Sequence, residues 1–185
     1  MLKHIIRIGT PFTKEAVKQL KAGDAVYISG IIYAARDAAH KKLIALLNEG
    51  KDLPFDVRDQ IIYYVGPCPA GPGQIIGSAG PTTSGRMDAY APVLIERGLT
   101  GMIGKGLRNE QVIASMVKNS AIYFGATGGA GALLSKCIIA EEITAFPELG
   151  PEALRKLTVK DFPTTVVIDS TGVDLYQTGR EQFKI

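Results

Sequence analysis

The sequence predicts an α/β protein in which strands and helices alternate along a chain of 185 residues. Short apolar runs recur along it and alternate with stretches whose apolar residues are spaced three and four apart. Apolar residues make up 46% of the chain, which is enough to build a core, and no repeat or linker interrupts the pattern. We therefore expect residues 1–185 to form a single domain.

Composition and charge argue against several classes of protein. Lys and Arg number 21 against 18 Asp and Glu, and a net charge of +3 is too small for a dedicated nucleic-acid binder. No apolar run approaches the about 20 residues of a membrane helix, and residues 1–4 lack the apolar stretch of a secretory signal. We therefore expect a cytoplasmic protein that binds neither nucleic acid nor membrane.

Soft metal ligands are scarce in this sequence. The chain has two cysteines, Cys68 and Cys137, and two histidines, His4 and His40, all far apart. A structural zinc site needs four such ligands, and an iron–sulfur cluster typically needs three or four thiolates. We expect this chain alone to hold no metal.

The first elements are predicted from caps and breakers. Thr13 caps a short helix over 14–22, and a strand over 25–28 follows it. The next helix carries Arg36 in its first turn, where a cation is mildly disfavoured, and ends before Gly50. Its apolar face is predicted to consist of Ala35, Ala39, Leu43, Leu46 and Leu47.

The middle of the chain contains two predicted strands, over 61–66 and 75–76. The segment 66–73 between them holds three prolines and three glycines and cannot form regular structure. The polar segment 77–85 leads into a further helix, which must start late or kink because an interior proline such as Pro92 costs about 3 kcal/mol. The apolar stripe of that helix is predicted to be Met87, Tyr90, Ala91, Leu94 and Ile95.

The alternation continues with strands over 102–103 and 121–124, and with a helix between them that Asn109 caps. A glycine-rich loop over 125–131 then opens into another helix. The inward faces of these two helices are predicted to be Val112, Ile113, Met116 and Val117 for the first, and Leu133, Leu134, Cys137 and Ile138 for the second.

The last part of the chain is predicted to contain a helix and a hairpin. Pro151 suits the first position of a short helix over 152–157. The hairpin joins strands over 164–169 and 173–176 through a turn at 170–172.

Three polar or glycine-rich loops lie where a strand ends and a helix begins, which is where open α/β sheets bind ligands. The segment from Gly80 to Arg86 carries the most chemistry, because it offers three hydroxyls and then a guanidinium that can grip a carboxylate. A helix cap followed by a solvated arginine explains the same residues without a ligand. Lys105 lies between two glycines in a segment without Walker spacing, and it is alternatively a turn lysine that faces water.

The remaining candidates have weaker claims to chemistry. Arg36 can pair with Asp37, and His40, one turn later, is predicted to be a packed or hydrogen-bonded orienter rather than a catalyst. Cys137 is predicted to be a core residue, whereas Cys68 lies between two prolines in a rigid loop where nothing nearby lowers a thiol pKa. Taken alone, the residues indicate three cations and a hydroxyl cluster that await a small anion.

Several motifs nevertheless resemble those of one enzyme family. The sequence resembles the β subunit, or equivalently the carboxy-terminal domain, of the class I iron–sulfur hydro-lyases, fumarate hydratase and L(+)-tartrate dehydratase. The residues that carry the resemblance span nearly the whole chain: 28–30 (Ile-Ser-Gly), 35–41 (Ala-Arg-Asp-Ala-Ala-His-Lys), 64–70 (Tyr-Val-Gly-Pro-Cys-Pro-Ala), 80–88 (Gly-Pro-Thr-Thr-Ser-Gly-Arg-Met-Asp), 104–106 (Gly-Lys-Gly) and 147–150 (Pro-Glu-Leu-Gly).

The resemblance implies a fold, a reaction and a partner. It implies a swivelling β/β/α domain with a mixed sheet, and reversible hydration of fumarate to (S)-malate, a step of the tricarboxylic acid cycle. It implies a [4Fe–4S] cluster held by a separate α subunit, whose open iron acts as a Lewis acid. It further implies an α₂β₂ hetro-oligomer, with a homodimer as a possible form of the isolated chain; a chain that begins at Met1 is expected to have its partner as a separate chain.

The family's functional residues carry over to four positions. Arg36, Arg86 and Lys105 match substrate-binding cations, and Thr82 matches the threonine proposed as catalytic base. A threonine hydroxyl is a poor base, so that role requires activation by a neighbouring cation or by the cluster side. Gly85 before Arg86 favours fumarate as the substrate, with L-tartrate as the alternative. A stand-alone anion- or nucleotide-binding module and a catalytically silent scaffold are the alternatives from other classes.

Overall fold

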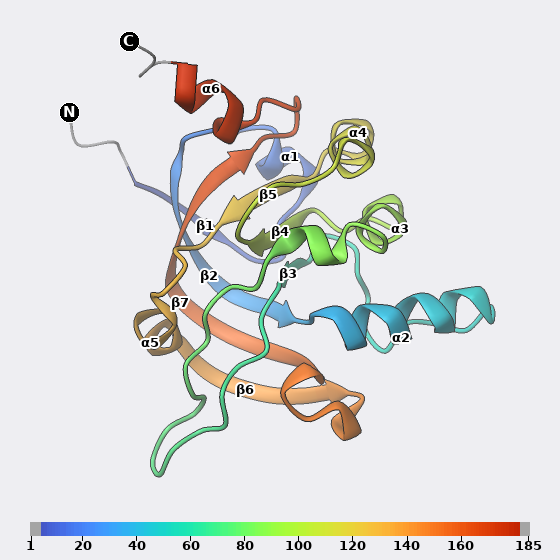
Figure 1. Ribbon diagram of the computed structural model, residues 1–185, viewed down its shortest axis with the longest axis vertical. Coiled ribbons are helices and arrows are strands. Elements are labelled where there is room, and N and C mark those ends of the chain that lie inside the picture. The colour runs from blue at the N-terminus through green and yellow to red at the C-terminus, as the bar shows by residue number, and fades with distance from the viewer. Residues whose placement is uncertain (1–4, 182–185) are drawn as a thin grey trace.

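The computed structural model describes residues 5–181, so the expectations about residues 1–4, His4 included, lie outside the described part. It contains a mixed sheet of seven strands (Figure 1), and this arrangement confirms the predicted α/β class. The strands, in their order across the sheet, are β1 (Ile6–Gly9), β2 (Ala25–Ala34), β3 (Ile61–Tyr63), β4 (Gly101–Gly104), β5 (Ile122–Gly125), β7 (Leu154–Ile168) and β6 (Ile138–Ala145).

Five of these strands close into a ring. Strands β2, β3, β4 and β5 pair in parallel, and β7 runs antiparallel to β5. The ring closes because β7 also pairs antiparallel with β2 along nearly its whole length. Strand β1 extends the sheet beside β2, and β6 extends it beside β7.

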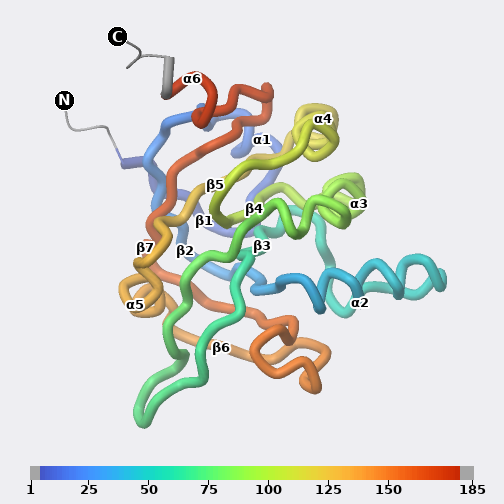
Figure 2. The backbone as a smooth tube through the Cα atoms, in the orientation of Figure 1, coloured from blue at the N-terminus to red at the C-terminus, as the bar shows by residue number. Residues whose placement is uncertain are grey.

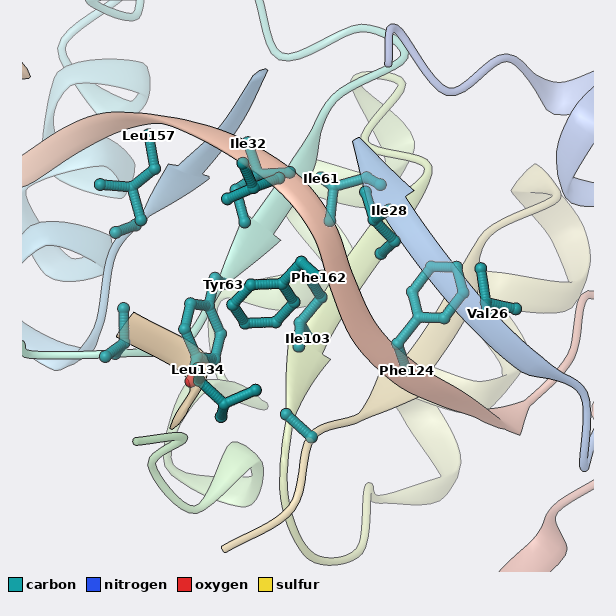
Figure 3. Packing of buried hydrophobic residues seen from close by; sticks show 14 of the residues in the cluster. Val26, Ile28, Ile32, Ile61, Tyr63, Ile103, Phe124, Leu134, Leu157 and Phe162 are labelled. Carbon is teal, nitrogen blue, oxygen red and sulfur yellow. The ribbon is translucent and has the colours of Figure 1, made fainter. Parts of the chain in front are cut away.

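Alternate residues of the ring strands fill two separate cores. In β3, Ile61 and Tyr63 point into the ring interior, which Figure 3 shows, whereas Ile62 and Tyr64 belong to a second core outside it. All four side chains are fully buried. Burial on both faces explains why these strands have continuous apolar sequences rather than alternating ones.

Helices cover the second core on one side of the ring (Figure 1). They are α2 (Asp37–Asn48), α3 (Ala91–Glu96) and α4 (Glu110–Asn119). The shorter elements are α1 (Lys14–Val17), α5 (Gly131–Leu134), α6 (Leu175–Glu181) and three 3-10 segments, η1 (Ser84–Met87), η2 (Ser135–Cys137) and η3 (Pro147–Glu152). Within residues 5–181, no helix has both the length and the apolar character needed to cross a bilayer.

The predicted helix starts are confirmed where a cap or a proline defines them. The Thr13 hydroxyl accepts a hydrogen bond from the Ala16 N–H at 3.4 Å, and the Asn109 side chain accepts one from Val112 at 2.9 Å. Helix α3 starts late, so that Pro92 lies in its first turn. Helix α1 is shorter than the predicted 14–22, because tighter turns after Val17 carry the chain toward β2.

Two predictions in the middle of the chain are wrong. Residues 75–76 form no strand: the neighbouring Gly77 N–H donates to the Cys68 carbonyl, and the Cys68 N–H donates to Ser78. The segment is therefore tied back to its own loop rather than to the sheet. Val117 does not point inward on α4 but is 44% exposed.

The predictions for the last third of the chain are wrong in three places. The helix after 131 ends within two turns, Leu133 is exposed, and Ile138 begins β6. The predicted helix over 152–157 is the start of β7, in which Leu154 packs in the outer core and Leu157 in the ring interior. The second hairpin strand is reduced to one bridge at Asp174, after which α6 begins.

Candidate functional site

The four candidate residues lie beyond the carboxyl ends of the parallel strands. Arg36 follows β2 and precedes α2, and Lys105 follows β4 directly. Figure 2 traces the long loop that leaves β3, extends away from the ring and returns at Thr82, ahead of Arg86 in η1. The glycine-rich segment 125–131 follows β5. Ligands bind α/β sheets at this end, where loops from several strands converge.

Main-chain hydrogen bonds hold Thr82 beside Lys105. The Thr82 N–H donates to the Tyr64 carbonyl at 2.8 Å, just past β3, and the Lys105 N–H donates to the Thr82 carbonyl at 3.3 Å. The Ser84 N–H in turn donates to the Lys105 carbonyl at 2.8 Å. The returning loop therefore lies against the chain after β4 like a short additional strand, and its position is set by the sheet itself.

Lys105 has an exposed side chain beside the glycine-rich loop. A Cβ atom placed on Gly128 would lie 3.5 Å from Cδ of Lys105 and 3.9 Å from its Nζ. No carboxylate within residues 5–181 lies at ion-pair distance from this ammonium group. Lys105 therefore offers an uncompensated positive charge at the end of the sheet.

Asp37 joins the two arginines of the site. Its Oδ1 lies 2.8 Å from Nε of Arg86, and its Oδ2 lies 3.2 Å from Nε of Arg36. Burial acts to raise the pKa of Asp37, but its own backbone N–H and the two guanidinium groups together hold that pKa below its ordinary value of 3.8. Asp37 is therefore ionised at neutral pH and fixes the two cations near one another.

Glu152 is a site residue that sequence reasoning missed. Its Oε1 lies 3.3 Å from Nε of Arg36, and its Oε2 accepts a hydrogen bond from the Ala38 N–H at 2.9 Å. Arg36 is the N-cap residue of α2 and forms no side-chain cap, so Glu152 of η3 satisfies that end of the helix. The sequence separation between Glu152 and Arg36 leaves no local pattern that predicts this contact.

Gly66 gives Arg36 its room. A Cβ atom at this position would lie 2.8 Å from Cδ and 3.0 Å from Nη1 of Arg36. A separation below 3.0 Å is closer than real Cβ contacts allow, so a larger residue would displace the guanidinium. The glycine that follows β3 is therefore a requirement of the neighbouring arginine.

A set of buried polar side chains lies beneath these residues. His40 is fully buried, and its Nδ1 lies 2.9 Å from the Arg36 carbonyl oxygen, which confirms the predicted hydrogen-bonded orienter. Burial, assisted by Arg108, lowers the pKa of His40 to about 4, so the ring is neutral at pH 7. Asp88 and Arg108, which sequence reasoning also missed, form a buried ion pair at 2.7 Å.

The cysteines take no part in this arrangement of contacts. Cys68 is exposed in the loop after β3, and Cys137 packs half-buried against the interior core, as predicted. Burial, with a contribution from Asp161, raises the pKa of the Cys137 thiol. In the described range, 5–181, no three His, Cys, Asp or Glu side chains are grouped so that they could hold a metal ion. These residues do not fit the ligand set of an iron–sulfur cluster.

The chemistry of the assembled site is that of a receptor for a small dianion. Two guanidinium groups share one internal carboxylate, a free ammonium group follows the next strand, and the Thr82 hydroxyl lies beside that ammonium-bearing segment. Guanidinium groups bind carboxylates in a two-pronged geometry, and an ammonium adds a point charge.

Comparisons with known proteins agree with this chemistry. The family model described as "Fumarase C-terminus" matches residues 2–179. "Fumarate hydratase class I, anaerobic" of Escherichia coli (strain K12) is 40% identical over 169 residues, which are 89% of this chain and 31% of that protein. "Fumarate hydratase 2" of Leishmania major is 39% identical over 166 residues, 88% of this chain and 29% of that protein.

A shorter relative is covered almost completely. "Putative L(+)-tartrate dehydratase subunit beta" of Methanocaldococcus jannaschii is 37% identical over 171 residues, which are 89% of this chain and 88% of that protein. By contrast, the chain spans about a third of the length of the two fumarate hydratases. Since the family model covers nearly all of the sequence, the chain belongs to the Fumarase C-terminus family.

Proposed function

We propose that this chain is the β subunit of an iron–sulfur-dependent class I fumarate hydratase, which hydrates fumarate reversibly to (S)-malate. The observation that carries the proposal is the convergence of Arg36, Arg86, Lys105 and Thr82 at one end of the sheet, from three separate parts of the chain. The similarity to proteins named fumarate hydratase supports the reaction class, hydro-lyase chemistry. In this proposal the chain acts as one domain.

The three cations bind the two carboxylates of the substrate. Arg86 is half exposed and is held only by Asp37, so an incoming carboxylate can take over one face of its guanidinium. Lys105 has its charge free for the other carboxylate. Arg36 is the most enclosed of the three, and it is held by Asp37 and Glu152 as a fixed wall of the site.

Thr82 Oγ1 is the atom to which we assign proton transfer at carbon. In the dehydration direction it accepts a proton from C3 of malate while the C2 hydroxyl leaves and the double bond forms. In the hydration direction it returns that proton as water adds at the other carbon. A hydroxyl needs a neighbouring positive charge to act as a base, and Lys105, which is hydrogen-bonded to Thr82 through the main chain, is placed to supply it.

A second chain completes the enzyme in this proposal. The described residues hold no ligand set for a cluster, and we infer that a [4Fe–4S] cluster belongs to a cluster-bearing α subunit. The chain spans about a third of the fumarate hydratases but most of the tartrate dehydratase subunit beta, which supports a separate subunit. We propose an α₂β₂ assembly in the cytoplasm, with a homodimer as a form of the isolated chain.

L(+)-tartrate dehydratase is the second candidate function, and the name of the Methanocaldococcus relative favours it. Gly85 favours fumarate. A Cβ atom there would meet the Leu107 carbonyl oxygen at 3.6 Å, so a bulkier residue would fill the space beside Arg86 rather than disturb the fold. Substrate choice therefore depends on the free space at position 85.

One experiment separates the candidates. The chain is coexpressed with its cluster-bearing partner, the cluster is reconstituted without oxygen, and fumarate hydration and L-tartrate dehydration are both assayed. We expect fumarate turnover by the complex and little by the chain alone. Tartrate turnover without fumarate turnover would assign the second function, whereas micromolar anion or nucleotide binding by the isolated chain, with no turnover in the complex, would identify a binding module.

A further inference from the structure

Four buried polar side chains connect the main chain beneath the three cations. They come from four different segments: His40 from α2, Tyr64 from the end of β3, Asp88 from the end of η1 and Arg108 from the segment before α4. The His40 and Tyr64 side chains are fully buried, and the Arg108 side chain has no exposed surface. Polar groups this deep in a core that is otherwise apolar require partners within the protein.

The contacts run in sequence from Asp88 to Arg36. Arg108 Nε donates to Asp88 Oδ1 at 2.7 Å, and its guanidinium lies over the Tyr64 ring, with Cζ 5.4 Å from the ring centroid. The His40 ring stands edge-on to the Tyr64 ring at a centroid distance of 5.3 Å. The far side of His40 reaches the Arg36 carbonyl oxygen.

The hydrogen-bonding capacities of these groups are complementary. A carbonyl oxygen only accepts, so Nδ1 of the neutral His40 ring carries the proton and Nε2 is left as an acceptor. Nε2 of His40, the Tyr64 hydroxyl and Nη2 of Arg108 are all buried without a partner among the described residues. Arg108 can only donate and Tyr64 can both donate and accept, so the three atoms form one donor-to-acceptor direction from Arg108 through Tyr64 to His40.

Each end of this series is attached to a segment that carries a site cation. His40 holds the carbonyl of Arg36. Asp88 follows Arg86 in η1 by two residues, and its second oxygen accepts from the Asn109 N–H at 2.7 Å, which fixes the segment between Lys105 and α4. The four side chains therefore relate the three cations to one another through the interior.

A second tie connects the same two loops. The Tyr123 hydroxyl donates to the Gly106 carbonyl at 2.9 Å and accepts from the Ser84 hydroxyl at 2.9 Å. Ser84 lies between Thr82 and Arg86, and Gly106 follows Lys105. The guanidinium of Arg108 also lies over the Tyr123 ring, at 5.1 Å. The hydroxyl ladder and the buried charge thus brace one region of the site.

We propose that His40, Tyr64, Asp88 and Arg108 form a positioning network that holds Arg36, Arg86 and Lys105 at the spacing of a four-carbon dicarboxylate. The network rests on the function proposed above for its ligand, and on the contacts of this chain for its existence. Its residues touch no substrate: they act through the main chain at Arg36 and through the segments that carry Arg86 and Lys105. Its consequence is discrimination by ligand length.

Two tyrosines form a matched pair for the test. Tyr64 and Tyr90 both place their rings against His40, at centroid distances of 5.3 and 6.1 Å. The Tyr64 hydroxyl is buried among the network atoms, whereas the Tyr90 hydroxyl forms no hydrogen bond within residues 5–181. Tyr64→Phe removes one network atom and keeps the ring, and Tyr90→Phe removes a hydroxyl outside the network.

The complex of the chain with its cluster-bearing partner is assayed with fumarate, and with succinate and malonate as inhibitors of four and three carbons. For Tyr64→Phe we expect KM to rise roughly tenfold and the ratio of the two inhibition constants to fall at least about threefold. Tyr90→Phe is expected to stay within about twofold of the wild type in both quantities. An active wild type in which Tyr64→Phe leaves KM and the inhibitor ratio unchanged would overturn the network.

A measurement on the chain itself keeps this test separate from the proposed function. Nitrogen-15 NMR of the histidine rings reports which nitrogen of His40 carries the proton. We expect the Nδ1–H form throughout pH 5.5–8 in the wild type and in Tyr90→Phe, and a mixture of tautomers in Tyr64→Phe. An Nε2–H form in the wild type would overturn the network. A complex with no hydro-lyase activity, together with the expected NMR result, would overturn the proposed function and leave the network established.

Discussion

Asp37 determines the charge balance of the site at the scale of single residues. One carboxylate holds two guanidinium groups, so the resting site is less positive than its three cations suggest. This pairing keeps Arg36 and Arg86 from repelling each other, since like charges this close are unfavourable. It also means that the substrate competes with Asp37 for Arg86, the more exposed of the two arginines.

Replacing Asp37 with asparagine changes the response of stability to acid. The folded-state pKa of Asp37 is depressed, so its stabilising contribution is complete above its unfolded pKa and is lost as pH falls through the folded value. Because the group is partly exposed, we expect Asp37→Asn to lose only about 0.5–1 kcal/mol at pH 7. Melting temperatures of the two proteins, measured from pH 7 to pH 2, should converge at the acid end. A constant difference across that range would contradict the assignment.

The fork geometry of Arg86 makes a second residue-level prediction. Lysine keeps the charge but cannot form two parallel hydrogen bonds to a carboxylate. We expect Arg86→Lys in the enzyme complex to lower kcat/KM for fumarate by roughly 10- to 100-fold, with the melting temperature nearly unchanged. Arg97→Lys is the control, because Arg97 is exposed at the end of α3 and forms no ion pair within the described residues. Equal effects of the two substitutions would contradict a carboxylate-binding role for Arg86.

At the scale of elements, the loop after β3 positions the site through one glycine. Gly66→Ala brings a Cβ atom within 2.8 Å of Cδ of Arg36, and a flexible side chain yields more easily than the sheet. We expect KM for fumarate to rise roughly tenfold while stability changes by less than about 1 kcal/mol. Gly80→Ala in the same loop is the matched control, since its Cβ would have no neighbour closer than 3.6 Å. A KM that responds equally to both changes would show that Arg36 does not depend on Gly66.

Elements with strong local caps and breakers could be predicted from the sequence, and elements defined by distant partners could not. Thr13, Asn109 and the position of Pro92 determine helix starts that the structure confirms. Strand β7 was missed at its start because Leu154 and Leu157 have helical spacing, although they lie on opposite faces of a strand. Its ladder with β2 involves partners more than a hundred residues away, which no local pattern contains.

The same distinction holds for the site. Arg36, Thr82, Arg86 and Lys105 lie in loops whose composition and resemblance to a family single them out, and the structure brings them together. The residues that hold them were missed because their roles depend on pairing across the fold. The missed residues are Glu152, Asp88, Arg108 and Tyr64. A weak indication existed for one of them, since a charged residue directly before a helix cap, as at Arg108, requires a partner.

At the scale of the whole molecule, closure of the ring makes distant segments depend on one another. Strand β2 pairs with β1 or β3 on one side and with β7 on the other, so it joins the first and last parts of the described chain. A site built at one end of a closed ring cannot widen by opening the sheet. This closure explains how loops from β2, β3 and β4 can present separate cations at a constant spacing.

Gly30 is the position at which this closure can be tested. It lies where the β2–β7 register shifts, with φ of +119°, and a Cβ atom there would approach Thr10 Oγ1 to 2.3 Å. Both the backbone conformation and the contact oppose any side chain, so we expect Gly30→Ala to destabilise the protein by about 2–4 kcal/mol. Because the ring couples its strands, the loss should appear as one cooperative transition at lower temperature, by fluorescence and circular dichroism alike. Gly9→Ala is the control, since its Cβ would meet only the Ser29 carbonyl at 4.0 Å; two separated transitions in Gly30→Ala would show that β7 can leave the ring independently.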